Sequence, residues 1–138
     1  MSDAILGSAK LDHVGIAAEG PELALAALLG VQEPELKTMP SGVAVGRFGR
    51  DHALELVVPT STGTPIDRFL QKRGPGLHHV ALAVDQPLDE LLPRLRAAGI
   101  EVAGEIEPSS DGRPSLFLHP SSTGGVLVEL VEGPKGGP

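Results

Sequence analysis

The chain contains no cysteine, tryptophan or tyrosine, and only three phenylalanines among its 138 residues. Without cysteine, disulfides, thiolate metal sites and a cysteine nucleophile are excluded. Apolar residues make up 41% of the chain, which is enough to build a core. Because aromatic residues are so scarce, this core must be aliphatic. No apolar run approaches the roughly 20 residues that span a bilayer, and the first residues lack the basic start of a secretory signal. We therefore expect a cytoplasmic protein with no membrane segment.

Basic residues are also few. Eleven Lys and Arg stand against 18 Asp and Glu, which gives a formal net charge of −7. Nucleic-acid binding depends on neutralising phosphates with Lys and Arg, so this balance argues against a nucleic-acid partner. A phosphorylated small molecule stays compatible, because a local basic patch is enough to hold it.

What the sequence does contain is an internal repeat. Residues 11–18 (LDHVGIAA) and 77–84 (LHHVALAV) both predict a strand of small and branched apolar residues with one imidazole near its start, His13 or His79. Each strand precedes a helical segment that opens with proline. Each half then closes on an apolar run with one carboxylate, Glu55 or Glu129.

Residue periodicity fills in the remaining elements. Helices are predicted at 21–29, with Leu25, Leu28 and Leu29 facing the core, at 65–70, and at 87–98, with Leu88, Leu91, Leu92 and Leu95 facing the core. Besides the two histidine strands, strands are predicted within 31–41, in a hairpin of 42–48 and 52–58, from 101, at 115–118 and at 125–131.

This pattern predicts one α+β domain, residues 1–138, made of two tandem β-α-β-β-β modules. Their strands are expected to form a curved mixed sheet around a metal site. Module 1 covers about 8–60, a linker helix lies within 61–76, module 2 covers about 77–132, and 133–138 form a disordered tail.

The repeated residues suit metal chemistry. His13, Glu55, His79 and Glu129 form a good ligand set for a divalent cation, with positions left for water or substrate. A lone strand histidine is more often structural, and a lone strand glutamate is usually solvated. One of each at equivalent places in both halves favours the metal interpretation.

The other histidines have different predicted roles. His78 points to the face opposite His79 and is expected to pack or to form hydrogen bonds. His52, at the hairpin, is expected to be solvated. His119 is a candidate to line the site from a loop.

Several motifs resemble methylmalonyl-CoA epimerases of the vicinal-oxygen-chelate (glyoxalase/bleomycin-resistance/dioxygenase) superfamily, over nearly the whole chain. The motifs are LDHVGIA (11–17), PIDRFL (65–70), GLHHVA (76–81) and, most specifically, FLHPSSTGGVLVEL (117–130). The resemblance implies paired modules, an acyl-CoA substrate and commonly a homodimer. It also implies a cobalt-like divalent ion (or Zn, Mn, Ni or Mg) on the four ligands, and a loop in which Ser121, Ser122 and Thr123 close over the ligand.

Epimerisation removes and returns the proton on a carbon between two carbonyls, which requires an acid/base group on each face of that carbon. The resemblance assigns one base to Glu129 and the other to a glutamate where this chain has Pro40. Proline cannot transfer a proton. We therefore predict that Glu55, the repeat mate of Glu129, is the second acid/base group, with Glu35 or a bound water next in line; Glu33 is also nearby in sequence.

Two alternatives remain at this stage. A glyoxalase I-type lactoylglutathione lyase shares a His, Glu, His, Glu set and uses metal-bound carboxylates as bases. A non-catalytic small-molecule-binding protein could use the same fold. If coenzyme A binds, its phosphates need basic residues at a rim, for which the candidates are Arg68, Lys72, Arg73 and Arg113, each otherwise a solvated surface charge.

Overall fold

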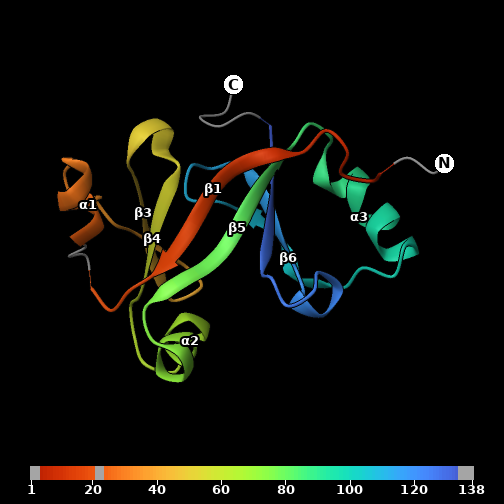
Figure 1. Cartoon of the computed structure of the whole chain (residues 1–138). Helices are drawn as coiled ribbons and strands as arrows, with labels where there is room; N and C mark the ends of the chain where they lie inside the picture. The colour runs from red at the N-terminus through yellow and green to blue at the C-terminus, as the bar shows by residue number, and fades with distance from the viewer. Residues whose placement is uncertain (1–3, 21–23, 134–138) are drawn as a thin grey trace. The chain divides into compact units, whose positions relative to one another are not determined.

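The computed structural model describes residues 4–20 and 24–133 of the chain, which divide into two compact units (Figure 1). The first unit takes in residues 13–78, and the second combines the segment before His13 with residues from 79 onward. The predicted Pro21 helix start and most of the predicted disordered tail lie outside the described residues. No helix of the described part is long and apolar enough to cross a membrane.

The strands of the first unit follow the order β2-β3-β4-β1. β1 pairs with β4 in parallel, while β3 lies antiparallel to both β2 and β4, so the pairing is mixed as predicted. The elements of this unit are β1 (Lys10–Ala17, its last five residues), α1 (Ala24–Leu29), β2 (Lys37–Met39), β3 (Val43–Phe48), the 3-10 turn η1 (Arg50–His52), β4 (Leu54–Pro59) and α2 (Pro65–Arg73).

Local sequence explains two features of this unit. The predicted linker helix is present as α2, where Thr64 Oγ1 accepts from Asp67 N at 3.2 Å and Asp67 Oδ2 accepts from Gly63 N at 2.8 Å, a reciprocal N-terminal cap. In β3, a Cβ added at Gly46 would lie 2.5 Å from the carbonyl oxygen of Glu35. Glycine is therefore required where the 34–35 segment crosses the hairpin.

The predicted core face of the first helix is correct for Leu25, which is partly buried, and wrong for the two leucines that follow. Leu28 and Leu29 are 83% and 50% exposed, and the buried residue of α1 is Ala26. Ala26 packs in a cluster with Ala18, Phe48, Leu56 and Val58. The helix therefore packs through Ala26 and Leu25 and leaves Leu28 and Leu29 outside.

The second unit repeats the pattern, with strand order β5-β8-β7-β6 and a parallel β5–β8 pair. β6 and β8 both run antiparallel to β7. Its elements are β5 (Gly76–Val84, from His79 on), α3 (Leu88–Ala97), β6 (Val102–Pro108), β7 (Pro114–Leu118), the 3-10 turn η2 (Pro120–Ser122) and β8 (Val128–Glu132).

Helix α3 carries the aliphatic core of this unit, as predicted. Leu88, Leu91 and Leu95 are at most 2% exposed and pack against β7 and β8. The segment before β1 joins this core through Ile5 and Leu6, which periodicity did not indicate.

Strand β4 begins at Leu54 rather than at 52, because Arg50–His52 form η1, and the start of the last strand also differs from the prediction. β8 begins at Val128 rather than at 125. Gly124 and Gly125 have positive φ angles of 71° and 94°, and Gly125 N donates to Pro120 O at 2.9 Å, so these residues form a turn.

Candidate metal and acid/base site

In the first unit, His13 and Glu55 face each other from two adjacent parallel strands. The β1–β4 register sets Gly15 beside Glu55, two residues beyond His13. His13 Nε2 and Glu55 Oε1 are 3.6 Å apart, and the two side chains are 0% and 8% exposed. A buried imidazole–carboxylate pair therefore lies where the repeat predicted half of a metal site.

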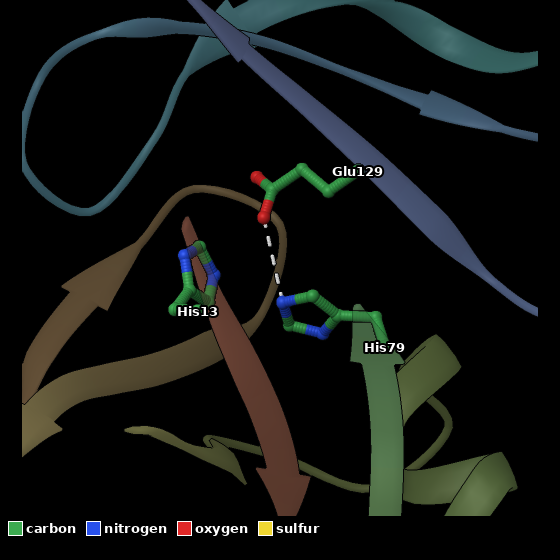
Figure 2. A group of neighbouring side chains, drawn as sticks. All are labelled: His13, His79 and Glu129. Atoms are coloured by element: carbon green, nitrogen blue, oxygen red, sulfur yellow. Dashed lines mark ion pairs between the residues drawn. The ribbon is translucent and has the colours of Figure 1, made fainter. Parts of the chain in front are cut away.

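The second unit contains the same arrangement in the same register. Ala81, two residues beyond His79, pairs with Glu129 across the parallel strands β5 and β8. His79 Nε2 and Glu129 Oε1 are 3.4 Å apart, with side chains 3% and 7% exposed, and Figure 2 shows the imidazole turned toward the carboxylate. The predicted equivalence of the two halves is thus present at the level of strand register.

Both pairs offer the kinds of atoms that bind divalent metal ions. His13, His79 and Glu129 are all buried, and each offers one atom of a kind that binds metals. Two ligands that each lie about 2.1 Å from one ion are roughly 3.0 Å apart at a right angle and roughly 3.4 Å apart at a tetrahedral angle. The separations of 3.4 Å and 3.6 Å within the pairs are close to this range.

The two carboxylates have different neighbours. Directly opposite Glu55 across the β3–β4 hairpin is Arg47, whose Nε donates to Glu55 Oε2 at 3.0 Å. Directly opposite Glu129 is Phe117, whose ring packs edge-on against His79 at a centroid distance of 5.5 Å. Neither residue types nor a turn confined to Gly49–Asp51 singles out Arg47, because Phe48 pairs with Leu54 and the turn between the strands spans residues 49–53.

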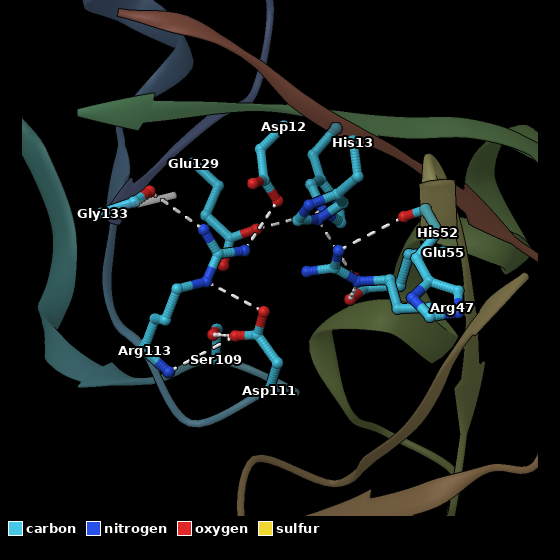
Figure 3. A network of polar contacts seen from close by, with 11 residues as sticks. Asp12, His13, Arg47, His52, Glu55, Ser109, Asp111, Arg113, Glu129 and Gly133 are labelled. Atoms are coloured by element: carbon cyan, nitrogen blue, oxygen red, sulfur yellow. Dashed lines mark hydrogen bonds and ion pairs between the residues drawn. The ribbon is translucent and has the colours of Figure 1, made fainter. Parts of the chain in front are cut away.

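A second arginine, Arg113, is buried in the loop before β7 (Figure 3). Its Nη2 donates to Asp12 Oδ2 and its Nε to Asp111 Oδ2, both at 2.9 Å, and its Nη1 donates to Gly133 O at 3.1 Å. Asp12 immediately precedes His13, so this network holds the residue next to a candidate ligand.

The electrostatics of this network follow from its contacts. Burial alone would raise the pKa of the Asp111 carboxyl, but the hydrogen bond from Ser109 and the charge of Arg113 outweigh burial and lower that pKa. Burial alone would lower the pKa of Arg113, but Asp12 and Asp111 outweigh it and raise that pKa. Both groups are therefore held in their charged forms.

This network corrects one prediction. Arg113 was proposed as a rim residue for coenzyme A phosphates or as a solvated charge, yet it is 5% exposed and bound to two carboxylates. The three other basic candidates, Arg68, Lys72 and Arg73, are exposed on α2.

The loop predicted to close over the ligand forms η2 and the turn after it. Ser121 Oγ contacts His119 Nδ1 at 2.8 Å, and Ser122 Oγ accepts from Glu101 N at 2.8 Å. Thr123 Oγ1 donates to Val126 O. The three hydroxyls therefore form hydrogen bonds that hold the loop conformation, while His119 and Ser121 remain exposed.

The remaining candidates lie as follows. His78 packs edge-on against Phe69 at 4.9 Å, which confirms a packing role, and His52 is exposed as predicted. Pro40 is exposed at the turn between β2 and β3, and Glu33 and Glu35 are exposed before β2.

Comparison with known proteins is consistent with this fold and site. The family model described as the Glyoxalase/Bleomycin resistance protein/Dioxygenase superfamily matches residues 12–117. The chain therefore belongs to this superfamily, whose α+β fold its two mixed-strand units display.

Within the superfamily, the relatives carry a narrower name. The chain is 34% identical over 129 residues to the human mitochondrial methylmalonyl-CoA epimerase, covering 89% of this chain and 73% of the relative. It is 37% identical over 131 residues to an ethylmalonyl-CoA/methylmalonyl-CoA epimerase of Cereibacter sphaeroides, covering 89% and 97%. The structure of methylmalonyl-CoA epimerase from Mycobacterium tuberculosis aligns with a TM-score of 0.81 at 30% identity, covering 98% and 94%. The chain is a member of the methylmalonyl-CoA epimerase family.

Proposed function

We propose that this protein epimerises methylmalonyl-CoA or a close 2-branched carboxyacyl-CoA. The observation that carries the proposal is the pair of buried His–Glu pairs in identical strand register, His13 with Glu55 and His79 with Glu129. One solved relative is titled as a complex with methylmalonyl-CoA, at a TM-score of 0.74 and 29% identity. The relatives favour this reaction over the glyoxalase and binding-protein alternatives.

The metal site is the first part of the proposal. His13, Glu55, His79 and Glu129 would together hold one divalent ion, with cobalt as the expected native metal. Bound there, the ion would act as a Lewis acid toward the thioester and carboxylate oxygens of the substrate and so increase the acidity of the α-hydrogen. Substrates that lack the free carboxylate should therefore react poorly.

The proton transfer is the second part. One carboxylate takes the α-hydrogen as a proton, the carbon becomes planar, and a carboxylic acid on the opposite face gives a proton back. We assign these roles to Glu129 and Glu55, which exchange them when the reaction runs in reverse. If a divalent ion is bound, the carboxylate oxygen that accepts or gives the proton would be one that also serves as a metal ligand.

Substrate contacts and assembly are the third part. We propose that His119, Ser121, Ser122 and Thr123 contact the acyl-CoA at the mouth of the site, and that exposed cations of α2 attract its phosphates. We also propose a cytoplasmic homodimer, for which light scattering at micromolar concentration should give twice the chain mass of 14.2 kDa.

The deciding experiment incubates each epimer of methylmalonyl-CoA with the cobalt-loaded protein in heavy water. Both epimers should exchange the α-hydrogen and interconvert. Propionyl-CoA, which lacks the second carboxylate, and the hemithioacetal of glutathione serve as controls and should not react. Turnover of the hemithioacetal without epimerisation would favour the lyase alternative. Metal-independent binding without exchange would favour the binding protein.

A further inference from the structure

The Arg47–Glu55 contact makes the two halves of the site chemically unequal. The guanidinium of Arg47 has side-chain exposure of 11% and donates to Glu55 Oε2 at 3.0 Å, and its Nη1 donates to His52 O at 3.4 Å (Figure 3). The opposite oxygen, Glu55 Oε1, is the one that faces His13. Oε2 of Glu55 is thus bound by the Arg47 guanidinium, and Oε1 faces the imidazole of the candidate metal ligand His13.

The second unit offers a direct comparison. The residue directly opposite Glu129 is Phe117, which packs on His79 and has no polar atom on its side chain. A carboxylate beside a guanidinium is stabilised as an anion and held in one orientation by a charge-assisted hydrogen bond. Phe117 provides neither effect to Glu129.

We propose that Arg47 is a positioning residue for Glu55 in the epimerisation, an inference that rests on the function proposed above. By holding Oε2, Arg47 directs Oε1 toward the metal ligand His13. While that oxygen takes up or releases the proton of the substrate carbon, Arg47 keeps the carboxylate in place. Arg47 thereby supports proton transfer at the Glu55 face of the carbon and leaves the Glu129 face alone.

The test compares Arg47→Gln and Arg47→Lys with Arg50→Gln, an exposed arginine on the same hairpin and therefore a matched control. For each cobalt-loaded variant, α-hydrogen exchange in heavy water is measured separately from the two epimers. Cobalt affinity of the metal-free protein and the thermal midpoint are measured alongside. These last two readouts detect a purely structural effect, because they do not depend on turnover.

Arg47→Gln is expected to slow exchange from one epimer by roughly 10- to 100-fold, the effect of one lost charge-assisted hydrogen bond. Exchange from the other epimer and cobalt affinity should stay within about threefold of wild type. Arg47→Lys should restore part of the loss at the same face, because it keeps the charge but not the fork geometry. Arg50→Gln should match wild type.

Two outcomes would overturn the inference. Equal slowing of both epimers with a parallel loss of cobalt would assign Arg47 a structural role, and unchanged exchange in Arg47→Gln would assign it none. If Arg47→Gln does not fold, Arg47→Lys alone decides between a loss at one face and an equal loss at both. Failure of the proposed function is recognised separately, because the wild-type protein would then exchange neither epimer.

Discussion

Replacing Arg113 by methionine removes the cation that balances Asp12 while keeping much of the side-chain volume. The side chains of Asp12 and Arg113 are only 1% and 4% exposed, so water cannot reach Asp12 to replace the hydrogen bond that Arg113 supplied. Asp111, the other carboxylate on Arg113, is 26% exposed and can be rehydrated. The variant therefore leaves the Asp12 carboxylate buried without the Arg113 guanidinium.

The expected magnitude follows from this difference in burial. Breaking a buried ion pair by removing one partner costs about 3–5 kcal/mol, because the remaining charge stays buried without compensation. The more exposed Asp111 contact adds only about 0–1 kcal/mol. At roughly 3–4 °C per kcal/mol for a chain of this size, the thermal midpoint should fall by about 10–20 °C.

Urea unfolding of the wild-type protein and the variant measures the change in the free energy of unfolding. Arg96→Met, on the exposed face of α3, is the matched control and should change stability by less than about 0.5 kcal/mol. Adding Asp12→Asn to Arg113→Met should recover part of the loss, since it removes the buried carboxylate charge. A loss below about 1 kcal/mol for Arg113→Met would refute the reasoning, because that value is typical of a solvated pair.

Three further predictions follow from the site and its surroundings. His79→Ala should remove most of the bound metal, whereas the control His78→Ala, on the same strand, should retain it. Elemental analysis after dialysis measures the metal content, and full metal in His79→Ala would reject the ligand assignment. Asp111 has a lowered pKa in the folded protein, so its stabilising contribution is present above the ordinary pKa of about 4 and disappears as pH falls through the folded value. The stability difference between wild type and Asp111→Asn should therefore shrink below about pH 4 in denaturant titrations; a constant difference would contradict this. Pro40→Glu should leave the rate unchanged if Glu55 is the second acid/base group, and a rate gain would show that a base is missing at that turn.

Much of the fold could be predicted from the sequence, because short-range periodicity determines the strands and helices. The α3 stripe of Leu88, Leu91 and Leu95 is buried as predicted. In α1, periodicity failed because leucine and alanine both fit an apolar face, and only the distance to the sheet decides which is buried. Leu28 and Leu29 are exposed, whereas Ala26 is buried and Leu25 is partly buried.

In the candidate site, too, some residues could be predicted from the sequence and others could not. The repeat identified both His–Glu pairs, since equivalent sequence positions adopt equivalent registers. The role of Arg113 was not predictable, because its partner Asp12 lies 101 residues away along the chain. The Arg47–Glu55 contact depends on the hairpin register, and the predicted turn at Gly49–Asp51 gives a different register from the observed turn over residues 49–53.

The central claim is that the two His–Glu pairs share one metal ion. An anomalous-scattering map from crystals grown with cobalt tests this directly. One peak per chain is predicted, about 2.0–2.2 Å from Nε2 of His13, Nε2 of His79 and one carboxylate oxygen each of Glu55 and Glu129. Two separate peaks, one at each pair, or a peak bound to a single pair, would contradict it.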